Sequence, residues 1–373
     1  MLKVALVGCG KIADEHASQI QRIKGCEIVG ACDREPLMAR QLCERFPIKQ
    51  YFGSLTELLN EARPDVVHVT TPPESHFDIA RLCLEAGCHV YVEKPFTLYE
   101  DDAERLIALA NERELKITAG HDHQFSHVAR RMRTLVRSGF LGGEPLHIES
   151  YYGYELGQAY ARALLGDAQH WVRRLPGKLL HNVISHGIAR IAEFLTTDSP
   201  QVVAYGFASP FLKRMGESEI VDELRVIICE EERTTAYFTF SSQMRPLLHQ
   251  FRIYGPKNGL ILDQNQETLI KLRGTGFKSY GEKFIPPVIM AKQYLGNLRT
   301  NLGTFLAADF HMKSGMKYLI ESFYHSIVNG APPPIPYREI LLTARIMDAI
   351  FAVLDAQHPA VEAHRPTVLQ TTT

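Results

Sequence analysis

The sequence predicts an α/β protein: a doubly wound parallel sheet in residues 1–122, followed by an α/β domain with a mainly antiparallel open sheet in residues 123–373. Three observations predict this organisation. Over the first third of the chain, short apolar runs alternate with helical patterns, as in a parallel sheet with crossover helices. A glycine-rich turn follows the first apolar run. Past residue 200, strand-like runs follow one another closely, as in an antiparallel sheet.

The first predicted unit is a strand, a glycine-rich turn, a helix and a second strand. Leu2 to Val7 is an apolar run long enough for one buried strand. The turn reads Gly8-Cys9-Gly10-Lys11-Ile12-Ala13, and a helical pattern through Ile20 follows. The second strand, Ile28 to Cys32, ends at Asp33, which lies 20 residues after Ala13 (33 − 13). This spacing matches the Gly-x-Gly-x-x-Ala fingerprint of a dinucleotide-binding Rossmann unit.

Residues of this turn have separate physical roles in dinucleotide binding. Gly8 permits the tight turn, Gly10 lets the pyrophosphate approach the backbone, and Ala13 lets the helix pack closely on the strand. The phosphates are received by the helix N-terminus. Asp33 accepts hydrogen bonds from ribose hydroxyls, which favours NAD, whereas the following Arg34 is suited to a 2′-phosphate and keeps NADP as an alternative. The predicted cofactor contacts of this unit are Gly8, Gly10, Lys11, Ile12, Ala13, Asp33 and Arg34.

The alternation continues to the end of the first domain. Predicted helices cover Glu35–Phe46, Leu55–Glu61, Glu74–Ala86 and Asp101–Glu112, and predicted strands cover Asp65–Thr70, His89–Val92 and Lys116–Ala119. Ligands of a doubly wound sheet bind at the carboxyl ends of its strands. The residues that fall at such ends are Gly8, Asp33, Thr71, Lys94 and His121.

The second domain opens with a predicted helix, Phe125–Arg137, and a strand near Leu146–Tyr152, and Leu179–Leu195 has helical apolar spacing. Further strands are predicted at Gln201–Phe207, Glu219–Cys229, Thr234–Ser241, His249–Tyr254 and Leu260–Leu262, and further helices at Lys313–Val328 and Arg338–Leu354. Helices should cover one face of this sheet. Whether the last helices pack back on the first domain is left open. We expect the polar end after Arg365 to be frayed.

Composition describes an ordinary globular protein. The chain has 373 residues, 45% of them hydrophobic and 22% charged, with a net charge of −1. This length suffices for two domains. There is no basic excess for nucleic acid, and no apolar run approaches the roughly 20 residues of a membrane span. The first strand begins at the N-terminus, and the seven cysteines form no Cys-x-x-Cys pair. We therefore expect no signal peptide, and buried thiols of a cytoplasmic protein.

Several motifs together resemble the Gfo/Idh/MocA family of dehydrogenases (glucose–fructose oxidoreductase, inositol dehydrogenase and rhizopine catabolism). They are the glycine-rich turn, Thr71-Pro72-Pro73 with His76, Glu93-Lys94-Pro95, Asn182-x-x-x-His186, the turn Gly255 to Leu260 and the break Asn329 to Pro334. The resemblance covers almost the whole chain. It implies a Rossmann domain and an α/β domain whose open sheet forms the oligomer interface in many members. It adds Thr71, Pro72, His76, Glu93 and Lys94 to the expected cofactor contacts.

Three residues are predicted to be catalytic. Oxidising a secondary alcohol needs a base for the hydroxyl proton, and a histidine has a suitable pKa. His186 lies four residues after Asn182, so both should project from one helical face, which the resemblance places against the nicotinamide and the substrate. Lys94 follows a strand beside a proline, where its ammonium can polarise the reacting oxygen. The family uses a lysine, an aspartate and a histidine. Asn182 replaces the aspartate and cannot take a proton, so His186 is the predicted base.

A group of histidines follows the last strand of the first sheet. In an extended segment His121 and His123 would share a face, and such a pair can ligate a metal. The family places contacts to substrate and nicotinamide here, so we favour a sugar contact for His123 and assign no metal. Trp171 either stacks on a sugar ring or fills a domain seam. The predicted substrate contacts are Lys94, His121, His123, Trp171, Asn182 and His186.

Residues 274–312 form an insertion relative to shorter family members. Apolar residues recur there at helical intervals between Phe284 and Phe310, with basic residues interspersed. We interpret the insertion as an extra helix that packs on the second domain or is buried between subunits. A partner or membrane-surface contact, or a lid over a bulky substrate, is the alternative. Because an open sheet edge needs covering, we expect a homodimer or homotetramer.

These features predict an NAD(P)-dependent oxidoreductase that acts on a secondary alcohol or ketone of a sugar, polyol or sugar nucleotide. Two alternatives stay open. One is a non-redox NAD-dependent sugar lyase or glycosidase. The other is a dinucleotide-binding regulatory protein without turnover, which Asn182 in place of the aspartate keeps open. The expected partners are small molecules rather than nucleic acid.

Overall fold

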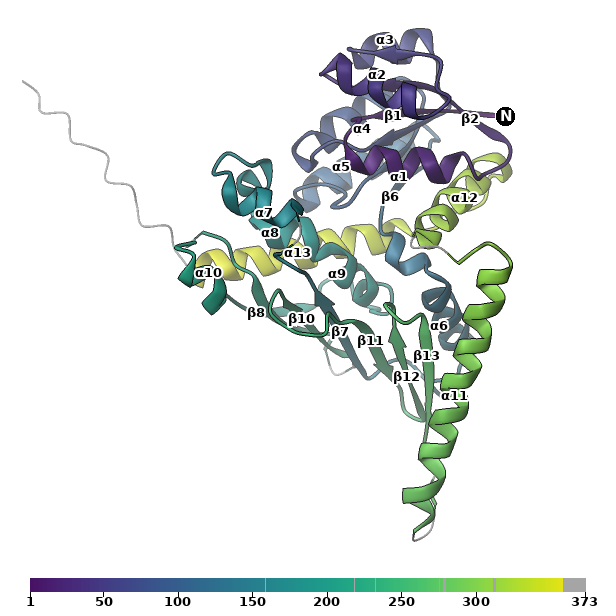
Figure 1. Ribbon diagram of the computed structural model, residues 1–373, viewed down its shortest axis with the longest axis vertical. Coiled ribbons are helices and arrows are strands. Elements are labelled where there is room, and N and C mark those ends of the chain that lie inside the picture. Colours follow the sequence, from purple (N-terminus) through teal and green to yellow (C-terminus); the bar gives the residue numbers. More distant parts are fainter. Residues whose placement is uncertain are drawn as a thin grey trace, which may run out of the picture.

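The computed structural model describes residues 1–157, 159–217, 219–231, 233–274, 276–277, 280–310 and 313–357. Figure 1 shows one sheet with its helices at the top and a second, larger sheet below it. The long helix α13 (Tyr337–Gln357) lies across the upper face of the second sheet. The segment after Arg365, which we expect to be frayed, lies outside the described residues.

The first sheet has six parallel strands in the order β3-β2-β1-β4-β5-β6, so the predicted doubly wound fold is confirmed. Its strands are β1 (Leu2–Val7), β2 (Cys26–Cys32), β3 (Tyr51–Phe52), β4 (Val66–Val69), β5 (His89–Val92) and β6 (Ile117–Ala119). Its helices are α1 (Lys11–Ile20), α2 (Pro36–Arg45), α3 (Leu55–Glu61), α4 (His76–Glu85) and α5 (Glu100–Glu112). Every residue of β4 is buried, as expected where helices cover both faces of a parallel sheet.

The second sheet has seven strands in the order β13-β12-β11-β7-β10-β9-β8. Its strands are β7 (His147–Gly153), β8 (Gln201–Phe207), β9 (Glu223–Cys229), β10 (Thr235–Ser241), β11 (His249–Tyr254), β12 (Asn258–Asp263) and β13 (Thr268–Arg273). All neighbours are antiparallel except β7 and β10, so the predicted mainly antiparallel sheet is confirmed. Strand β13 is not among the predicted strands, and its short apolar run is defined by its pairing with β12.

The helices of the second half are α6 (His127–Arg137), α7 (Ala159–Gly166), α8 (Lys178–Val183), α9 (Ser185–Ala192), α10 (Pro210–Arg214), α11 (Gly281–Leu306) and α12 (Ser314–Asn329). The predicted helix 179–195 is wrong as one continuous element, because it is interrupted at Ile184 between α8 and α9. Gly187 lies against β10, where an added Cβ would meet Phe238 Cε2 at 2.3 Å. This close contact with the sheet is not visible in the apolar spacing.

Two hydrophobic cores lie under the two sheets. The first includes Leu319 and Phe323, so α12 packs on the first sheet although it follows the second in the sequence. Helix α13 contributes Ile340 to the first core and Ile346 and Phe351 to the second. Helix α13 thus packs on both sheets and connects them, whereas α12 packs on the first sheet.

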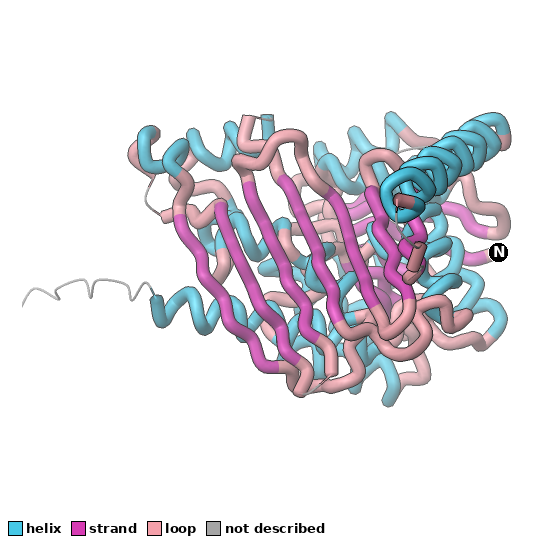
Figure 2. The backbone as a smooth tube through the Cα atoms, turned by 90° about the horizontal axis from the view of Figure 1, so that it is seen from below, coloured by secondary structure: helices cyan, strands magenta, loops and turns pink. Residues whose placement is uncertain are grey.

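The other face of the second sheet carries no helix, as Figure 2 shows. Side chains such as Val203 and Tyr205 on β8 are exposed there. The insertion forms the single helix α11, which lies along β13 but leaves most of its large apolar side chains in solvent. Within the described ranges, no helix combines the length and apolar character that a bilayer crossing requires. All seven cysteines are free thiols, and Cys9, Cys32, Cys83 and Cys88 are buried.

Candidate active site

The glycine-rich turn between β1 and α1 has the backbone that its sequence predicts. Gly8 has φ +94°, and a Cβ there would lie 2.6 Å from Thr71 Cγ2 and 2.7 Å from Thr71 N. Only glycine fits this position without displacing the loop after β4. Gly10, by contrast, has open space in front of it, with no atom within 4 Å of an added Cβ. The space over Gly10 is suited to a phosphate group.

The start of α1 and the end of β2 complete the features that a dinucleotide needs. Gly10 is the N-cap of α1 and supplies no side-chain cap, so the first amides of the helix remain for a ligand. At the end of β2, the Asp33 carboxylate accepts hydrogen bonds from Cys9 N (2.7 Å) and Glu35 N (2.9 Å), which hold it beside the turn. Arg34 is exposed. These residues fit NAD.

The loop after β4 is held in place by a buried histidine. His76 Nε2 lies 2.9 Å from Thr71 O and His76 Nδ1 lies 2.9 Å from Pro95 O. Because the His76 side chain is fully buried and both nitrogens face backbone carbonyls, it positions two loops rather than contacting the cofactor itself. The sequence predicted a cofactor contact for His76, and this assignment is corrected. Thr71 and Pro72 remain at the surface beside Gly8.

Glu93 is the end of a buried chain of hydrogen-bonded polar groups. Tyr324 Oη lies 2.8 Å from His68 Nε2, His68 Nδ1 lies 2.8 Å from His16 Nδ1, and His16 Nε2 lies 2.9 Å from Glu93 Oε1. The other Glu93 oxygen accepts from Lys94 N at 3.1 Å. Burial raises the pKa of Glu93, but the hydrogen bond and charge of His16 and the charge of Lys94 outweigh it, so the pKa is lowered. The chain thus fixes the turn that carries Lys94.

Lys94 reaches from the end of β5 to the second domain. Its ammonium donates to the backbone carbonyl of Asn182 at 3.0 Å, at the end of α8. Burial lowers the pKa of Lys94, and the carboxylates of Glu93 and Asp122 oppose that shift. The ammonium therefore bridges the two domains at the point where α8 ends. The structure thus brings the Lys94 ammonium to the backbone of Asn182.

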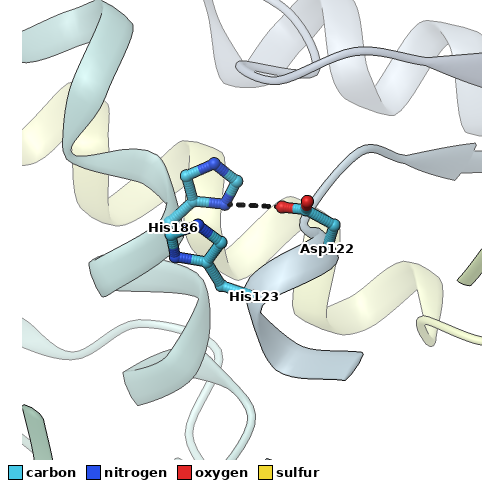
Figure 3. Close-up of side chains that lie close together, drawn as sticks. All are labelled: Asp122, His123 and His186. Atoms are coloured by element: carbon cyan, nitrogen blue, oxygen red, sulfur yellow. Dashed lines mark ion pairs between the residues drawn. The ribbon is translucent and has the colours of Figure 1, made fainter. Parts of the chain in front are cut away.

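His186, at the start of α9, lies in a cluster with two residues of the segment after β6 (Figure 3). Its ring stacks on that of His123 with 3.9 Å between centroids and 8° between planes. His186 Nδ1 lies 3.7 Å from Asp122 Oδ1, an ion-pair distance longer than a hydrogen bond. Burial, followed by His123 and Lys94, lowers the pKa of His186 well below its ordinary value. Burial raises the pKa of Asp122 to about 6. At neutral pH the pair is a neutral imidazole beside a carboxylate.

The possible ligand atoms of Asp122, His123 and His186 lie within 4.8 Å of one another, and one carboxylate with two imidazoles is a common set of metal ligands. The two rings are almost parallel, however, and imidazole lone pairs lie in the ring planes. The lone pairs therefore run side by side instead of converging on one ion. We assign the trio to hydrogen bonding and proton transfer. The extended segment that would place His121 and His123 on one face is not formed, because residues Asp122–Phe125 form a 3-10 turn. The rings of both histidines nevertheless lie beside His186.

A cavity of about 600 Å³ opens beside the cluster, walled by residues of both halves of the chain. It is lined by Asp122, His123, Ser126, His127, Tyr152, Gly153, Tyr154, Glu155, Leu247, His249, Gln264, Asn265, Glu267, Phe310, Lys313, Ser314 and Gly315. Sequence reasoning gave no site role to Asp122, Tyr152 or His249. Asp122 lies just after the carboxyl end of the last strand of the first sheet, and that position could have predicted a site role. Tyr152 and His249 lie on β7 and β11, and no sequence pattern indicates that they line a site.

The other two predicted substrate contacts lie differently. His121 is buried, its ring centroid lies 6.2 Å from that of His186, and neither of its nitrogens has a partner in the described part of the chain. Burial lowers the pKa of His121 to about 4. Trp171 starts a short 3-10 turn, Trp171–Arg174, where its ring stacks on His170. It is not among the described residues that line the cavity.

Comparison with known proteins places this geometry in context. Over residues 2–121 the chain matches the model of an oxidoreductase family with an NAD-binding Rossmann fold. D-glucoside 3-dehydrogenase of Escherichia coli (strain K12) is 31% identical over 142 residues, which are 38% of this chain and 40% of the relative. UDP-N-acetylglucosamine 3-dehydrogenase of Acidithiobacillus ferrooxidans is 30% identical over 149 residues, 40% of this chain and 44% of the relative. The chain therefore spans less than half of these relatives.

Solved structures share the fold over nearly the whole chain. The UDP-N-acetylglucosamine 3-dehydrogenase from Acidithiobacillus ferrooxidans superposes with a TM-score of 0.70 at 21% identity, covering 95% of this chain and 99% of that one. The WlbA dehydrogenase from Bordetella pertussis, solved with NADH and UDP-GlcNAcA, gives 0.74 at 18% identity, covering 95% and 96%. The fold and the glycine-rich turn define a dinucleotide-binding protein with an appended sheet domain. Over its first domain the chain matches the model of the Gfo/Idh/MocA oxidoreductase family.

Proposed function

We propose that the chain is an NAD(P)-dependent dehydrogenase that interconverts a secondary alcohol and a ketone on a sugar, polyol or sugar nucleotide. The observation that carries the proposal is the convergence of Lys94, Asn182 and His186 beside the carboxyl ends of the Rossmann strands. Ligands of this fold class bind at those ends. When bound, the nicotinamide supplies the hydride acceptor for oxidation.

In this proposal His186 takes the hydroxyl proton of the substrate. Its lowered pKa keeps the imidazole neutral near pH 7, so the ring is ready to accept a proton. The carboxylate of Asp122, 3.7 Å from Nδ1, then stabilises the imidazolium that forms. A low pKa weakens a base, and the nearby carboxylate offsets that weakness as the proton arrives. The carbon–hydrogen bond breaks with its electron pair leaving as hydride, and a ketone remains.

Lys94 stabilises the charge that develops on the substrate oxygen. Its ammonium is already held by Asn182 O, so little reorganisation is needed when the alkoxide forms. Asn182 can donate or accept a hydrogen bond with a sugar hydroxyl, but it cannot replace the base. The proton therefore goes to His186 in the proposed mechanism.

The cavity supports a substrate larger than a simple polyol. Its volume of about 600 Å³ lies within the range of small-molecule sites. Tyr152 and Tyr154 offer aromatic faces to a sugar ring, and Lys313 places a positive charge at the wall. A phosphate group would be attracted by that charge. We therefore propose a sugar or sugar nucleotide as substrate, which agrees with the names of the two relatives.

Turnover of a substrate panel tests the proposal. The full chain is incubated with NAD or NADP and with sugars, polyols and sugar nucleotides, and the absorbance of reduced nicotinamide is followed. We expect one substrate class to give turnover and His186→Gln and Lys94→Met each to reduce kcat by about 10²- to 10⁴-fold, the range for general acid–base catalysis. NADH binding should persist in His186→Gln.

Matched controls are His325→Gln and Lys24→Met, which change an exposed histidine and an exposed lysine. Both should retain wild-type turnover. Full activity in His186→Gln would refute the assignment of the base. Conversion of a sugar without net NADH release would favour the lyase or glycosidase alternative, and NADH binding with no turnover across the panel would favour the regulatory one.

A further inference from the structure

The buried polar chain behind the active site joins four elements of the structure. Its members are Tyr324 on α12, His68 on β4, His16 on α1 and Glu93 after β5. Successive members lie 2.8, 2.8 and 2.9 Å apart. Both histidines are fully buried, and the Tyr91 ring stacks on one and packs edge-on against the other. The chain is therefore enclosed in the core of the first domain and meets the active site only at Glu93.

The contact between the two histidines limits where the protons of the chain lie. His16 and His68 face each other through their Nδ1 atoms, so one of these nitrogens carries a proton and the other accepts it. His16 Nε2 donates to Glu93 Oε1, because the pKa of Glu93 is lowered and a carboxylate oxygen can only accept. His68 Nε2 faces the Tyr324 hydroxyl, which can donate or accept. A donor therefore reaches Glu93 whichever histidine carries the shared proton.

The donor from His16 decides the charge of Glu93. A buried carboxylate is stable only when hydrogen bonds and opposite charges compensate its loss of water. Within the described ranges Glu93 accepts two hydrogen bonds, one from His16 and one from the backbone N–H of Lys94. Burial raises the pKa of Glu93, and the bond from His16 is the largest influence that lowers it. Without this donor, burial prevails and the carboxyl takes up a proton.

The charge of Glu93 acts in turn on Lys94. Burial lowers the pKa of Lys94, and Glu93 opposes this shift more strongly than Asp122 does. The other titratable groups that act on Glu93 or Lys94 from the surrounding elements are His76, Tyr91, His121, Asp122, His123, His186 and Lys313. Asp122 is the one carboxylate among them. Loss of the Glu93 charge would therefore remove the stronger of the two carboxylates that hold the proton on Lys94.

We propose that His16 and His68 are positioning residues of the reaction, which keep the Glu93 carboxylate ionised so that its charge keeps the Lys94 ammonium protonated. The inference rests on the proposed function, in which that ammonium stabilises the developing alkoxide. Both histidines act through Glu93, because both are fully buried in the first domain. A chain that served only to hold the fold together would affect stability and leave the protonation of Lys94 unchanged.

Competitive acetylation of the full chain, read by mass spectrometry, measures the deprotonated fraction of Lys94 against pH without turnover. Two variants at His16 form a matched pair. The shorter amide of His16→Asn keeps the side of the ring that faces His68 and falls short of Glu93, whereas the amide of His16→Gln reaches Glu93 and can donate to it. We expect His16→Asn to move the midpoint of Lys94 labelling to lower pH by about 1–3 pH units, the effect of one neighbouring charge, and His16→Gln to keep the wild-type midpoint. The exposed Lys24 is the internal reference and should not move.

The pH profile of kcat/KM gives a second readout. Because a lower pKa means that Lys94 loses its proton at lower pH, the alkaline fall in kcat/KM should also move to lower pH in His16→Asn. Glu93→Gln, which leaves His16 in place, should produce the same shift, and adding His16→Asn to it should shift the profile no further, since both act through one carboxylate. Gln19→Met changes another buried polar residue of α1 outside the chain and should leave labelling and profile unchanged.

A Lys94 midpoint that stays at the wild-type value in His16→Asn and in Glu93→Gln would overturn the proposal. A shift in Gln19→Met as large as that in His16→Asn would also overturn it, because the effect would then belong to the packing of α1. If no substrate of the panel is turned over, the proposed function fails, and the labelling still decides whether His16 controls the charge of Lys94.

Discussion

Two glycine substitutions separate the folding role of the glycine-rich turn from its binding role. At Gly8, alanine would have to adopt φ +94°, which costs about 1–2 kcal/mol, and its Cβ would overlap Thr71 N at 2.7 Å, which costs about 1–3 kcal/mol. Backbone atoms cannot move aside as a flexible side chain can. We therefore expect Gly8→Ala to lower the free energy of unfolding by about 2–5 kcal/mol. At Gly10, with φ −76° and nothing within 4 Å of the new Cβ, the expected change is within about 0.5 kcal/mol.

NADH binding should be weakened directly by the substitution at Gly10, the one that is expected to leave stability unchanged. The Gly10→Ala methyl would occupy the open space where we place a phosphate, so we expect NADH to bind more weakly by about 1–3 kcal/mol, or about 5- to 150-fold in Kd. Urea unfolding of the cofactor-free protein measures stability, and NADH fluorescence titration measures binding. Equal destabilisation by both substitutions, or unchanged NADH binding in Gly10→Ala, would refute the reasoning from the turn geometry.

Three further variants test other parts of the chain. Burial raises the pKa of Asp122 to about 6, so kcat/KM should fall as pH decreases through 6, because protonation removes the carboxylate that stabilises protonated His186. The pH profile of Asp122→Asn should lack this fall, and a profile like that of the wild type would contradict the role. Asn297→Ala leaves the backbone N–H and carbonyl of Leu269 on β13 without these partners and should lower the free energy of unfolding in urea by about 2–4 kcal/mol. A decrease below about 0.5 kcal/mol would argue that Asn297 does not hold α11 to β13. Burial raises the pKa of Glu339 from 4.5 to about 7, so the folded carboxyl holds its proton more tightly than the unfolded one and the wild type loses stability as pH rises through that window. The free energy of unfolding of Glu339→Gln should therefore rise relative to that of the wild type by up to roughly 3 kcal/mol between pH 4.5 and 7. A difference between the two proteins that does not change with pH would contradict this.

The sequence predicted the first domain well because its signals are local. Gly8 and Gly10 act through the backbone of one turn, and Asp33 ends the adjacent strand, so their spacing alone specifies the dinucleotide site. The strands of the first sheet are buried on both faces and therefore appear as continuous apolar runs. Lys94 follows from the same rule, because it lies at the carboxyl end of one of those strands.

The second domain was less predictable because its elements are defined by pairing and contact between distant segments. Strand β13 exists through its ladder with β12, and the interruption at Ile184 accompanies the close contact of Gly187 with Phe238. The predicted common face of Asn182 and His186 depended on an unbroken helix. The two residues are instead linked through Lys94, whose ammonium bonds to Asn182 and whose charge acts on His186.

The sequence by itself determined the cofactor class, the parallel sheet and the identity of the groups able to do the chemistry. Only the tertiary structure decided which of them act together: it turned His76 inward to hold two loops, stacked His123 on His186, and placed Asp122 at its Nδ1 atom. It also decided that α11 presents Gln293 and Asn297 to β13 and leaves large apolar side chains such as Leu295 exposed. The physical reason is that periodicity fixes which residues share a face, whereas the direction of that face depends on the partners that the rest of the chain supplies.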